Sequence, residues 1–462
     1  MEQQFINRKE ELKFLESKYD SNKPELILIY GRRRVGKTEL IKKFINGKKN
    51  AIYFLVTNEG IKENIKQFRN TIAETLKIEY FKDLDIENFN RLFYYLAKEL
   101  KERTILVIDE FPYLIENDRT IISQFQKIWD EYLKDKNILL ILMGSSIGLM
   151  NELMNYKSPL YGRRTGQYEI NPLSLIHLKE YFNVDFEELI KIYAIIGGVP
   201  AYFTLLNPEA SLDEIVKEKI IKKGEFLFEE PIFLLTQEFR ETRIYLMILK
   251  YIALGYNTFG KLNGILEFDK GNISKYLYRL EQLKLIETIL PIGRKKGGIY
   301  RIKDYFFNFW FRFVYPNKKD LELGLVNGVF NRIKKEFNSF FGRVFENIIL
   351  ELLETKQINI KLDFTKIGRW WHKDKEIDIV AVDEFNNEIL FGECKWKSNV
   401  DAKKILKELK EKAKDVQWNN ETRKEKYAIF AKSFKTKTNQ ALCIDLKKLE
   451  RKIREKIYII TS

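Results

Sequence analysis

The sequence predicts an α/β protein of several domains, in which a P-loop parallel sheet is followed by a helical lid, a winged helix and a second, C-terminal α/β domain. Three observations predict this fold class. Strand-like apolar runs alternate with helical patterns over residues 26–171, as in a doubly wound parallel sheet. Three helical patterns and a hairpin follow near residues 240–303. A second group of strands, which carries carboxylates, lies closer to the C-terminus.

The length of 462 residues indicates about three domains. The predicted segments are a P-loop core at residues 1–175, a helical lid subdomain at 176–238, a winged helix at 239–316, a linker at 317–335 and the second α/β domain at 336–462. The lid is expected because helical patterns fill this stretch and Gly197-Gly198-Val199-Pro200 interrupts them.

The phosphate-binding loop follows the strand-like run Glu25–Tyr30 and fits the pattern G-x-x-x-x-G-K-[ST]. Its glycines let successive backbone N–H groups turn toward a phosphate. Lys37 reaches the β- and γ-phosphates, and the Thr38 hydroxyl ligates Mg²⁺. The candidate nucleotide-binding residues here are Gly31, Arg32, Arg33, Arg34, Val35, Gly36, Lys37 and Thr38. We therefore expect ATP and Mg²⁺ as ligands; the alternative is a chance match in a basic turn.

Two later strands supply the rest of the expected nucleotide site. Thr104–Glu110 is a buried-type strand that ends in two carboxylates. Asp109 would hold the Mg²⁺ shell, and Glu110 would orient or deprotonate the attacking water. The next strand ends at Ser145, where a sensor of the γ-phosphate would lie. The alternatives are a solvated acidic turn and a serine that caps the following helix.

The amino-acid composition limits the cellular compartments and the classes of partner that we expect for this protein. A net charge of +15 and a pI near 9.3 favour an acidic polymer such as DNA as partner, although a nucleotide accounts for part of this charge. The two cysteines, Cys394 and Cys443, exclude a disulfide framework and suit a reduced cytosol. Apolar runs of about eight residues are too short for a membrane span of roughly 20. We expect a cytoplasmic protein with neither a signal peptide nor a membrane segment.

The winged helix is predicted from three helical patterns, the last at residues 272–283, and a hairpin around a basic loop. The third helix would direct basic and polar residues toward a DNA groove. These residues are Lys270, Asn272, Lys275 and Arg279, and the wing would add Arg294, Lys295 and Lys296 at the phosphates. The alternative is a winged helix that contacts protein. The aromatic block at residues 305–313 either stacks on single-stranded bases or packs inside the protein.

A second chemical site is predicted from three residues on two C-terminal strands. Asp378 lies on the first strand, and Glu393 and Lys395 lie two residues apart on the second. Asn386-Asn387 between them is a hairpin signal. We expect Asp378 and Glu393 to bind Mg²⁺ and Lys395 to orient the attacking water, as in a D…E-x-K nuclease. Glu346 on the preceding helix would support the site; the alternative is an amphipathic hairpin with surface ion pairs.

With these motifs identified, the chain resembles the archaeal ATPase family within the signal-transduction (STAND) branch of P-loop NTPases. The resemblance lies in the P-loop, Ile-Asp-Glu-Phe-Pro-Tyr-Leu at 108–114, Met-Gly-Ser-Ser at 143–146, Leu-Tyr-Gly-Arg-Arg-Thr-Gly at 160–166, Gly-Gly-Val-Pro at 197–200 and Phe-Gly-Glu-Cys-Lys-Trp at 391–396. It implies an ATPase, a winged helix and a restriction-endonuclease-like domain of the PD-(D/E)xK nuclease type at 336–462. It also implies that Arg163 or Arg164 contacts the γ-phosphate, although both can equally form structural pairs.

These expectations combine into one functional hypothesis. The nucleotide state of a cytosolic ATPase sets the arrangement of the winged helix and the nuclease-like domain on DNA. One alternative is a signalling switch that binds ATP and a protein partner or a second copy of itself, with a catalytically silent nuclease-like scaffold. Another is a structural nucleic-acid binder with slow, incidental ATP hydrolysis.

Overall fold

The computed structural model describes residues 5–267 and 270–461, with side chains described up to residue 455 and not at Lys270. Contacts within the chain divide it into two compact units. The first unit comprises Met1–Leu173 together with Val199–Thr204. The second comprises Ser174–Gly198 together with Leu205–Ser462.

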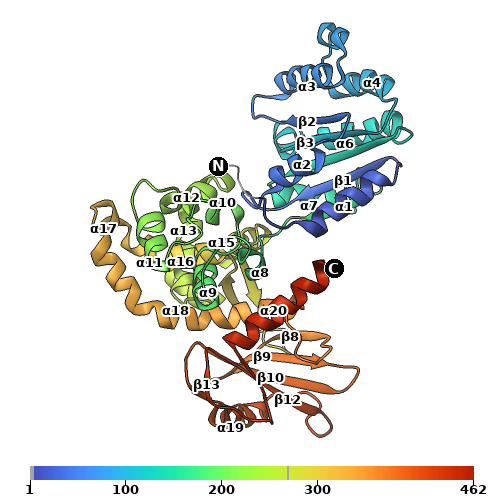
Figure 1. Cartoon of the computed structure of the whole chain (residues 1–462). Helices are drawn as coiled ribbons and strands as arrows, with labels where there is room; N and C mark the ends of the chain where they lie inside the picture. The colour runs from blue at the N-terminus through green and yellow to red at the C-terminus, as the bar shows by residue number, and fades with distance from the viewer. Residues whose placement is uncertain (1–4, 268–269, 462) are drawn as a thin grey trace. The chain divides into compact units, whose positions relative to one another are not determined.

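The first unit is built on a five-stranded parallel sheet with the strand order β2-β3-β4-β1-β5 (Figure 1). Its strands are β1 (Glu25–Tyr30), β2 (Ala51–Leu55), β3 (Thr104–Asp109), β4 (Ile138–Gly144) and β5 (Gly166–Glu169). The predicted parallel α/β sheet is therefore confirmed. The strand β1 lies between β4 and β5, so its C-terminal end opens toward the ends of β3 and β4, where polar side chains were predicted.

Helices pack on both faces of this sheet, which explains the nearly continuous apolar strands. Leu26 and Leu28 face one core and Ile27 faces the other, as the two-residue period of a strand requires. The helices are α1 (Lys9–Asp20), α2 (Lys37–Ile45), α3 (Ile61–Leu76), α4 (Phe89–Glu99), α5 (Pro112–Asn117), α6 (Ile121–Ile128), α7 (Ile147–Met154) and α10 (Pro200–Phe203), with short helical turns η1 (Glu79–Asp83) and η2 (Trp129–Leu133).

The second unit begins with a helical region. Its elements are α8 (Leu175–Leu178), α9 (Phe186–Ile196), α11 (Leu212–Glu214), η3 (Ile215–Ile220), α12 (Phe226–Glu238), α13 (Thr242–Ala253), α14 (Phe259–Leu266), α15 (Lys270–Gln282), β6 (Ile286–Ile289), β7 (Ile299–Ile302), α16 (Tyr305–Phe309), η4 (Trp310–Val314) and η5 (Tyr315–Asn317). Three helices, α13 to α15, precede the antiparallel hairpin β6–β7, which is the predicted order of elements. The side chain of Lys270, predicted on the third helix, lies outside the described residues. The aromatic block is buried, so packing accounts for it.

The segment predicted as a linker is helical. It contains α17 (Lys318–Glu322) and the first part of α18 (Val326–Glu354), which runs through the predicted boundary at residue 335. The reason is an apolar stripe: Val329, Ile333 and Phe337 follow at four-residue spacing and are buried. The helix α18 therefore joins the helical region to the C-terminal sheet as one continuous element (Figure 1).

The C-terminal sheet has the order β14-β12-β10-β9-β8. Its elements are β8 (Lys366–His372), β9 (Lys375–Asp383), β10 (Glu388–Lys395), β11 (Val400–Asp401), α19 (Ala402–Ala413), β12 (Lys424–Ala431), β13 (Phe434–Thr436), β14 (Leu442–Asp445) and α20 (Leu446–Thr461). Strands β8, β9 and β10 pair antiparallel, and β10, β12 and β14 pair parallel. The helix α19 packs on the core that contains Phe391, while α18 contacts β9 and β10. The predicted hairpin of β9 and β10 around Asn386-Asn387 is present.

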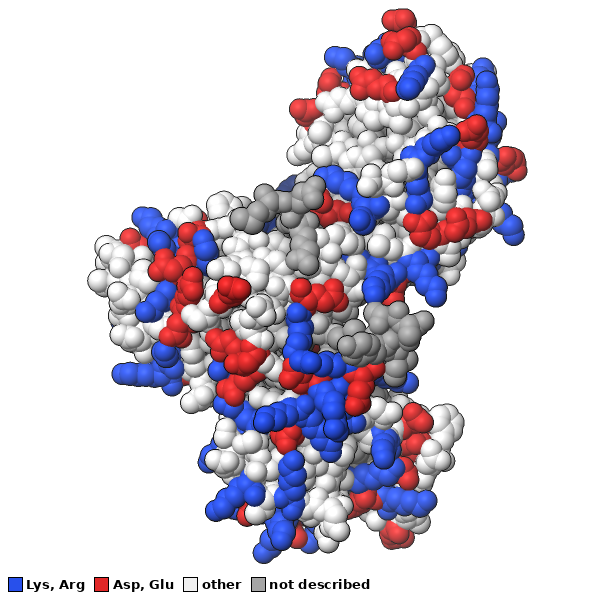
Figure 2. Space-filling view, viewed as in Figure 1, with Lys and Arg blue, Asp and Glu red and all other residues white. Residues whose placement is uncertain are grey.

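Charged residues are spread over the surface, with Lys and Arg gathered over α20 on the face in Figure 2 and carboxylates among them. Some of this charge is paired: Glu450 of α20 binds both Lys179 and Arg454. Both cysteines are buried and free. Among the described helices, none combines the length and apolar character that a membrane crossing requires.

Candidate functional site

The phosphate-binding loop lies between β1 and α2, and its backbone requires glycine at two positions. A Cβ atom on Gly31 would lie 2.3 Å from the carbonyl oxygen of Ile170, so no larger residue fits. Gly36 caps α2 with φ of 90°, a left-handed conformation that glycine adopts without strain. The backbone therefore turns sharply into the N-terminus of α2, where free N–H groups and the helix dipole favour an anion.

Lys37 is the first residue of α2, and its side chain folds back over the loop. Its Nζ donates to the carbonyl oxygens of Gly31 at 2.9 Å and Arg32 at 3.0 Å. The side chain is buried, with 6% of the residue exposed. The loop thus holds an ammonium group against backbone oxygens, close to the helix terminus that favours phosphate.

The other loop residues are tied to the surrounding unit. Arg33 donates to the hydroxyl of Tyr113 at 3.2 Å. The carbonyl oxygen of Val35 accepts a hydrogen bond from Arg8 at 2.7 Å. Arg34 has φ of 71°, and its carbonyl oxygen accepts from the backbone N–H of Ala201 at 3.5 Å. The segment Val199–Thr204 therefore contacts the loop within the first unit.

The carboxylate of Asp109, at the end of β3, accepts three hydrogen bonds from uncharged donors. Its Oδ2 accepts from Thr38 Oγ1 at 3.0 Å and from the Tyr53 hydroxyl at 2.5 Å. Its Oδ1 accepts from the backbone N–H of Glu110 at 2.8 Å. Burial raises the pKa of Asp109, and the hydrogen bonds from Tyr53 and Thr38 oppose that rise. Burial and the same carboxylate also raise the pKa of Tyr53, which keeps this hydroxyl a donor.

Glu110 follows in a left-handed conformation, with φ of 53°. This turn directs its carboxylate to the end of β4, where Oε2 accepts from Ser145 Oγ at 2.8 Å and from the Ser145 backbone N–H at 3.3 Å. The structure therefore joins three of the predicted nucleotide-site residues, Asp109, Glu110 and Ser145, at one edge of the sheet. Ser145 contacts Glu110, and no side-chain cap is formed at the start of α7.

The two arginines implied by the resemblance have structural partners. Arg163 binds the carboxylate of Asp130, at 2.9 Å from Nη2 to Oδ2, and donates to the carbonyl oxygen of Pro159. Arg164 donates to the carbonyl oxygen of Met154 at 3.2 Å, and its guanidinium lies 4.9 Å from the centroid of the Tyr161 ring.

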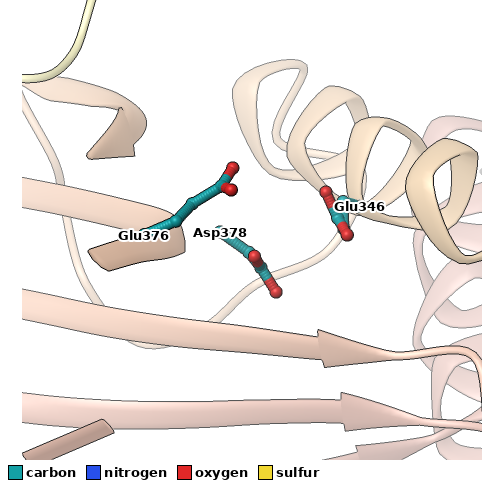
Figure 3. A group of neighbouring side chains, drawn as sticks. All are labelled: Glu346, Glu376 and Asp378. Carbon is teal, nitrogen blue, oxygen red and sulfur yellow. The ribbon is translucent and has the colours of Figure 1, made fainter. Parts of the chain in front are cut away.

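In the second unit, three carboxylates come together from α18 and β9. Oxygen atoms of Glu346, Glu376 and Asp378 all lie within 4.8 Å of one another (Figure 3). A bulge in β9 contributes, because Gly368 pairs with Val380 and Trp370 with Ile377, which leaves one additional residue on β9 opposite Arg369. Such bulges re-aim side chains, and here the bulge lies at Asp378. We call Glu346, Glu376 and Asp378 the acidic cluster.

Arg369 of β8 provides the positive charge beside the acidic cluster. Its Nη1 lies 2.8 Å from an oxygen of Glu346 and 3.5 Å from one of Glu376. Its Nη2 donates to the side chain of Asn347 at 2.8 Å. Burial, followed by the charges of Glu346 and Glu393, raises the pKa of Asp378 to about 8, while a hydrogen bond from the Cys394 N–H opposes that rise. Burial also raises the pKa of Glu346, which Arg369 counteracts.

The other predicted residues lie on β10. Ile379 of β9 pairs with Gly392 of β10 in an antiparallel register. Asp378 and Glu393 are the next residues of these two strands beyond that pair. The Glu393 carboxylate binds Lys395 at 2.7 Å and Lys412 of α19 at 3.1 Å. Glu393 is not part of the acidic cluster, in which Glu376 takes a place beside Asp378.

Sequence reasoning missed Tyr53, Glu376, Arg369 and Lys412. Glu376 had a usable signal, because it lies two residues before Asp378 on the same strand. Tyr53 and Arg369 had no such signal in the sequence. Their contacts depend on which strands and helices become neighbours, and the sequence pattern does not determine this.

Comparison with known proteins identifies the family. A family described as an ATPase domain predominantly from Archaea matches residues 5–206. An uncharacterized protein of Methanocaldococcus jannaschii is 38% identical over 452 residues, which cover 96% of this chain and 99% of that protein. The chain belongs to this archaeal ATPase family. The predicted family resemblance is thereby confirmed for the ATPase.

Further matches bear on parts of this archaeal ATPase. A family of archaeal and bacterial proteins of unknown function matches residues 310–405. An uncharacterized ATP-binding protein of M. jannaschii is 69% identical over 45 residues, 10% of this chain and 76% of that protein. The Walker-type ATPase of Pyrococcus abyssi has a TM-score of 0.50 and 24% identity, and the match covers 66% of this chain and 96% of that chain. At this identity the last match supports the fold alone.

Proposed function

We propose that this archaeal ATPase binds ATP with Mg²⁺ at the P-loop, hydrolyses it, and uses its nucleotide state to control the hairpin region and the nuclease-like C-terminal domain on DNA. The observation that carries the proposal is the hydrogen bond between Thr38 of the loop and Asp109 of β3, 3.0 Å long. It joins the phosphate-binding and acidic motifs, which are 71 residues apart, in one site.

The residues at this edge fit Mg²⁺. Two ligands at neighbouring corners of an octahedron, each about 2.1 Å from the ion, lie roughly 3 Å apart. Thr38 Oγ1 and Asp109 Oδ2 have this separation, 3.0 Å. When bound, Mg²⁺ would neutralise phosphate charge. The oxygens of Thr38 and Asp109 would hold it directly or through water, and Tyr53 would keep Asp109 in place.

The roles of the remaining residues follow from their positions. The N-terminus of α2 and the loop N–H groups would hold the phosphates. Lys37 would exchange its two carbonyl acceptors for phosphate oxygens, a charge-assisted and therefore stronger contact. Glu110 would orient the attacking water and accept its proton, with Ser145 holding the carboxylate. Arg163 and Arg164 would reach a γ-phosphate only by leaving Asp130 and the Met154 carbonyl oxygen.

The proposed action on DNA rests on the second unit. The acidic cluster offers oxygen donors close enough for one divalent cation. Asp378 would be the central ligand, shared between this cluster and Glu393 of the predicted D…E-x-K set. Lys395 would neutralise charge that develops on the scissile phosphate. Basic residues of the α15 and hairpin region would contact the DNA backbone, as in a winged helix.

One observation favours the second candidate, a signalling switch that binds a protein partner. Each carboxylate region of the nuclease-like domain already has internal cations: Arg369 at Glu346 and Glu376, and Lys395 with Lys412 at Glu393. These cations offset the charge of the carboxylates without a metal ion, as a catalytically silent scaffold would require.

Assays of ATP hydrolysis and DNA cleavage with Mg²⁺ test the proposal. DNA should stimulate ATP turnover, whereas a passive nucleic-acid binder shows no stimulation. Asp378→Ala and Lys395→Ala should each abolish Mg²⁺-dependent cleavage while ATP hydrolysis persists. ATP hydrolysis without any cleavage by the wild-type protein would support the switch with a silent scaffold.

A further inference from the structure

The hairpin β6–β7 is attached to the C-terminal sheet and does not stand alone. In the loop between its strands, the Ile292 N–H donates to the carbonyl oxygen of Arg369 at 2.8 Å. The Ile292 side chain lies against Gly368 and packs on the core of the C-terminal sheet. The loop of the hairpin is therefore anchored at β8, the strand that carries Arg369.

A second anchor brings two basic turns together. The Arg294 guanidinium of the hairpin loop donates to Nδ1 of His372 at 2.8 Å. His372 ends β8 and begins the turn to β9, so this bond joins segments 78 residues apart. Both residues are exposed. The hairpin loop and the β8–β9 turn therefore lie side by side on the surface. We call this surface the composite basic edge; it consists of Arg294, Lys295, Lys296, His372 and Lys373.

Most of the positive charge of the composite basic edge is not paired with carboxylates in the described parts of the chain. Lys295, Lys296 and Lys373 are exposed, and in the described parts of the chain none of them forms an ion pair. Lys375, next along the turn, is bound to Asp415. Asp374 is the one carboxylate between Lys373 and Lys375. Free ammonium groups at a surface attract phosphates without first having to break an internal pair.

The surroundings of the edge favour a nucleic acid over a protein as its partner. The loop reads Gly-Arg-Lys-Lys-Gly at residues 293–297, and the turn reads His-Lys-Asp-Lys at 372–375. Lysine, which dominates both segments, is depleted at protein–protein interfaces and suits phosphate contacts, although the hairpin loop also exposes Leu290. The acidic cluster is next to the edge, because Arg369 binds Glu346 and Glu376 from the strand that ends at His372.

We propose that the composite basic edge is a single DNA-backbone site, to which the C-terminal sheet contributes as well as the hairpin. The proposal rests on the proposed action on DNA and deepens it: the hairpin and the nuclease-like domain grip one duplex together, beside the acidic cluster. A wing that contacts DNA on its own would make no use of Lys373.

The salt dependence of binding to a labelled 30-base-pair duplex tests this site. Each phosphate contact that is lost lowers the log–log slope by about 0.9. Lys295→Ala with Lys296→Ala should lower the slope by about 2, Lys373→Ala by about 1, and the triple variant by about 3. Lys407→Ala, at an exposed position of α19, is the matched control and should keep the wild-type slope.

The outcomes separate this proposal from the wider one. An unchanged slope in Lys373→Ala would overturn the composite edge, even if the hairpin variant loses affinity. Wild-type slopes in all variants would place DNA elsewhere on the chain and leave the proposed function standing. No duplex binding by the wild-type protein, or tighter binding of polyglutamate at equal salt, would overturn DNA as partner, while ATP hydrolysis measured in the same samples reports on the nucleotide site.

Discussion

The P-loop site and the acidic cluster both gather carboxylates, but they balance the charge in different ways. The three hydrogen bonds described for Asp109 come from neutral donors: two hydroxyl groups and a backbone N–H. The acidic cluster instead lies against a cation of the protein, because Arg369 contacts Glu346 and Glu376. In the first site the carboxylate is held by neutral donors, whereas in the second a guanidinium of the protein already lies against two of the carboxylates. An external ion at the second site competes with a guanidinium that is already there.

The largest expected effect on folding stability comes from removing that guanidinium. Arg369→Gln should lower the free energy of unfolding by roughly 3 kcal/mol, since it leaves the partly buried carboxylate of Glu346 without the counter-charge of the buried guanidinium. Denaturation in urea without divalent ions measures this loss. Lys366→Gln on the same strand breaks only the exposed pair with Glu384 and should keep the wild-type midpoint. If Arg369→Gln is equally harmless, the acidic cluster is not balanced internally.

At the P-loop, the corresponding test removes the ammonium group that bridges the loop. Lys37→Ala should raise the Kd for ATP roughly 100-fold, which corresponds to about 2.7 kcal/mol for a charge-assisted contact. Titration with a fluorescent ATP analogue measures it. Lys42→Ala on the same helix removes an exposed partner of Glu39 and is the control. A Kd within about twofold of wild type would mean that Lys37 serves the fold of the loop alone.

A smaller effect tests whether the hydrogen bond from the Tyr53 hydroxyl helps Asp109 to bind Mg²⁺. Tyr53→Phe should raise the Mg²⁺ concentration for half-maximal ATP hydrolysis roughly fivefold, or about 1 kcal/mol, because Asp109 loses one of the groups that hold it. Tyr80→Phe is the matched control, since Tyr80 also donates to a carboxylate, that of Glu99. A lower Mg²⁺ requirement in Tyr53→Phe would show that the hydroxyl competes with the ion.

The two sites also differ in how far the sequence could predict them. The P-loop is a contiguous motif after a strand, and the polar residues at the ends of β3 and β4 meet because parallel strands end at one edge. The acidic cluster is assembled from α18 and β9, and its counter-charge, Arg369, comes from β8. Asp378 was predicted from its hairpin, whereas the position of Glu376 in the cluster depends on the bulge opposite Arg369, which the sequence pattern does not reveal.

The predicted linker and Arg163 also show that a sequence pattern does not reveal contacts between distant segments. The break at Pro316-Asn317 exists as a short helical turn, but the apolar stripe of α18 resumes within a few residues and continues the helix. A γ-phosphate contact of Arg163 or Arg164 was implied by resemblance alone, with structural pairing as the alternative, and the structure pairs Arg163 with Asp130. Local motifs carried the predictions that held, while long-range pairing decided the rest.

The most direct test of the central claim is single-turnover ATP hydrolysis by Glu110→Gln, with ATP binding measured on the same variant. The account predicts an affinity within about twofold of wild type and a hydrolysis rate lower by roughly 10²- to 10⁴-fold, because the amide cannot accept the proton of the attacking water. Glu116→Gln, at an exposed position of α5, should hydrolyse ATP normally. Full turnover by Glu110→Gln would contradict the account and remove Glu110 from the mechanism.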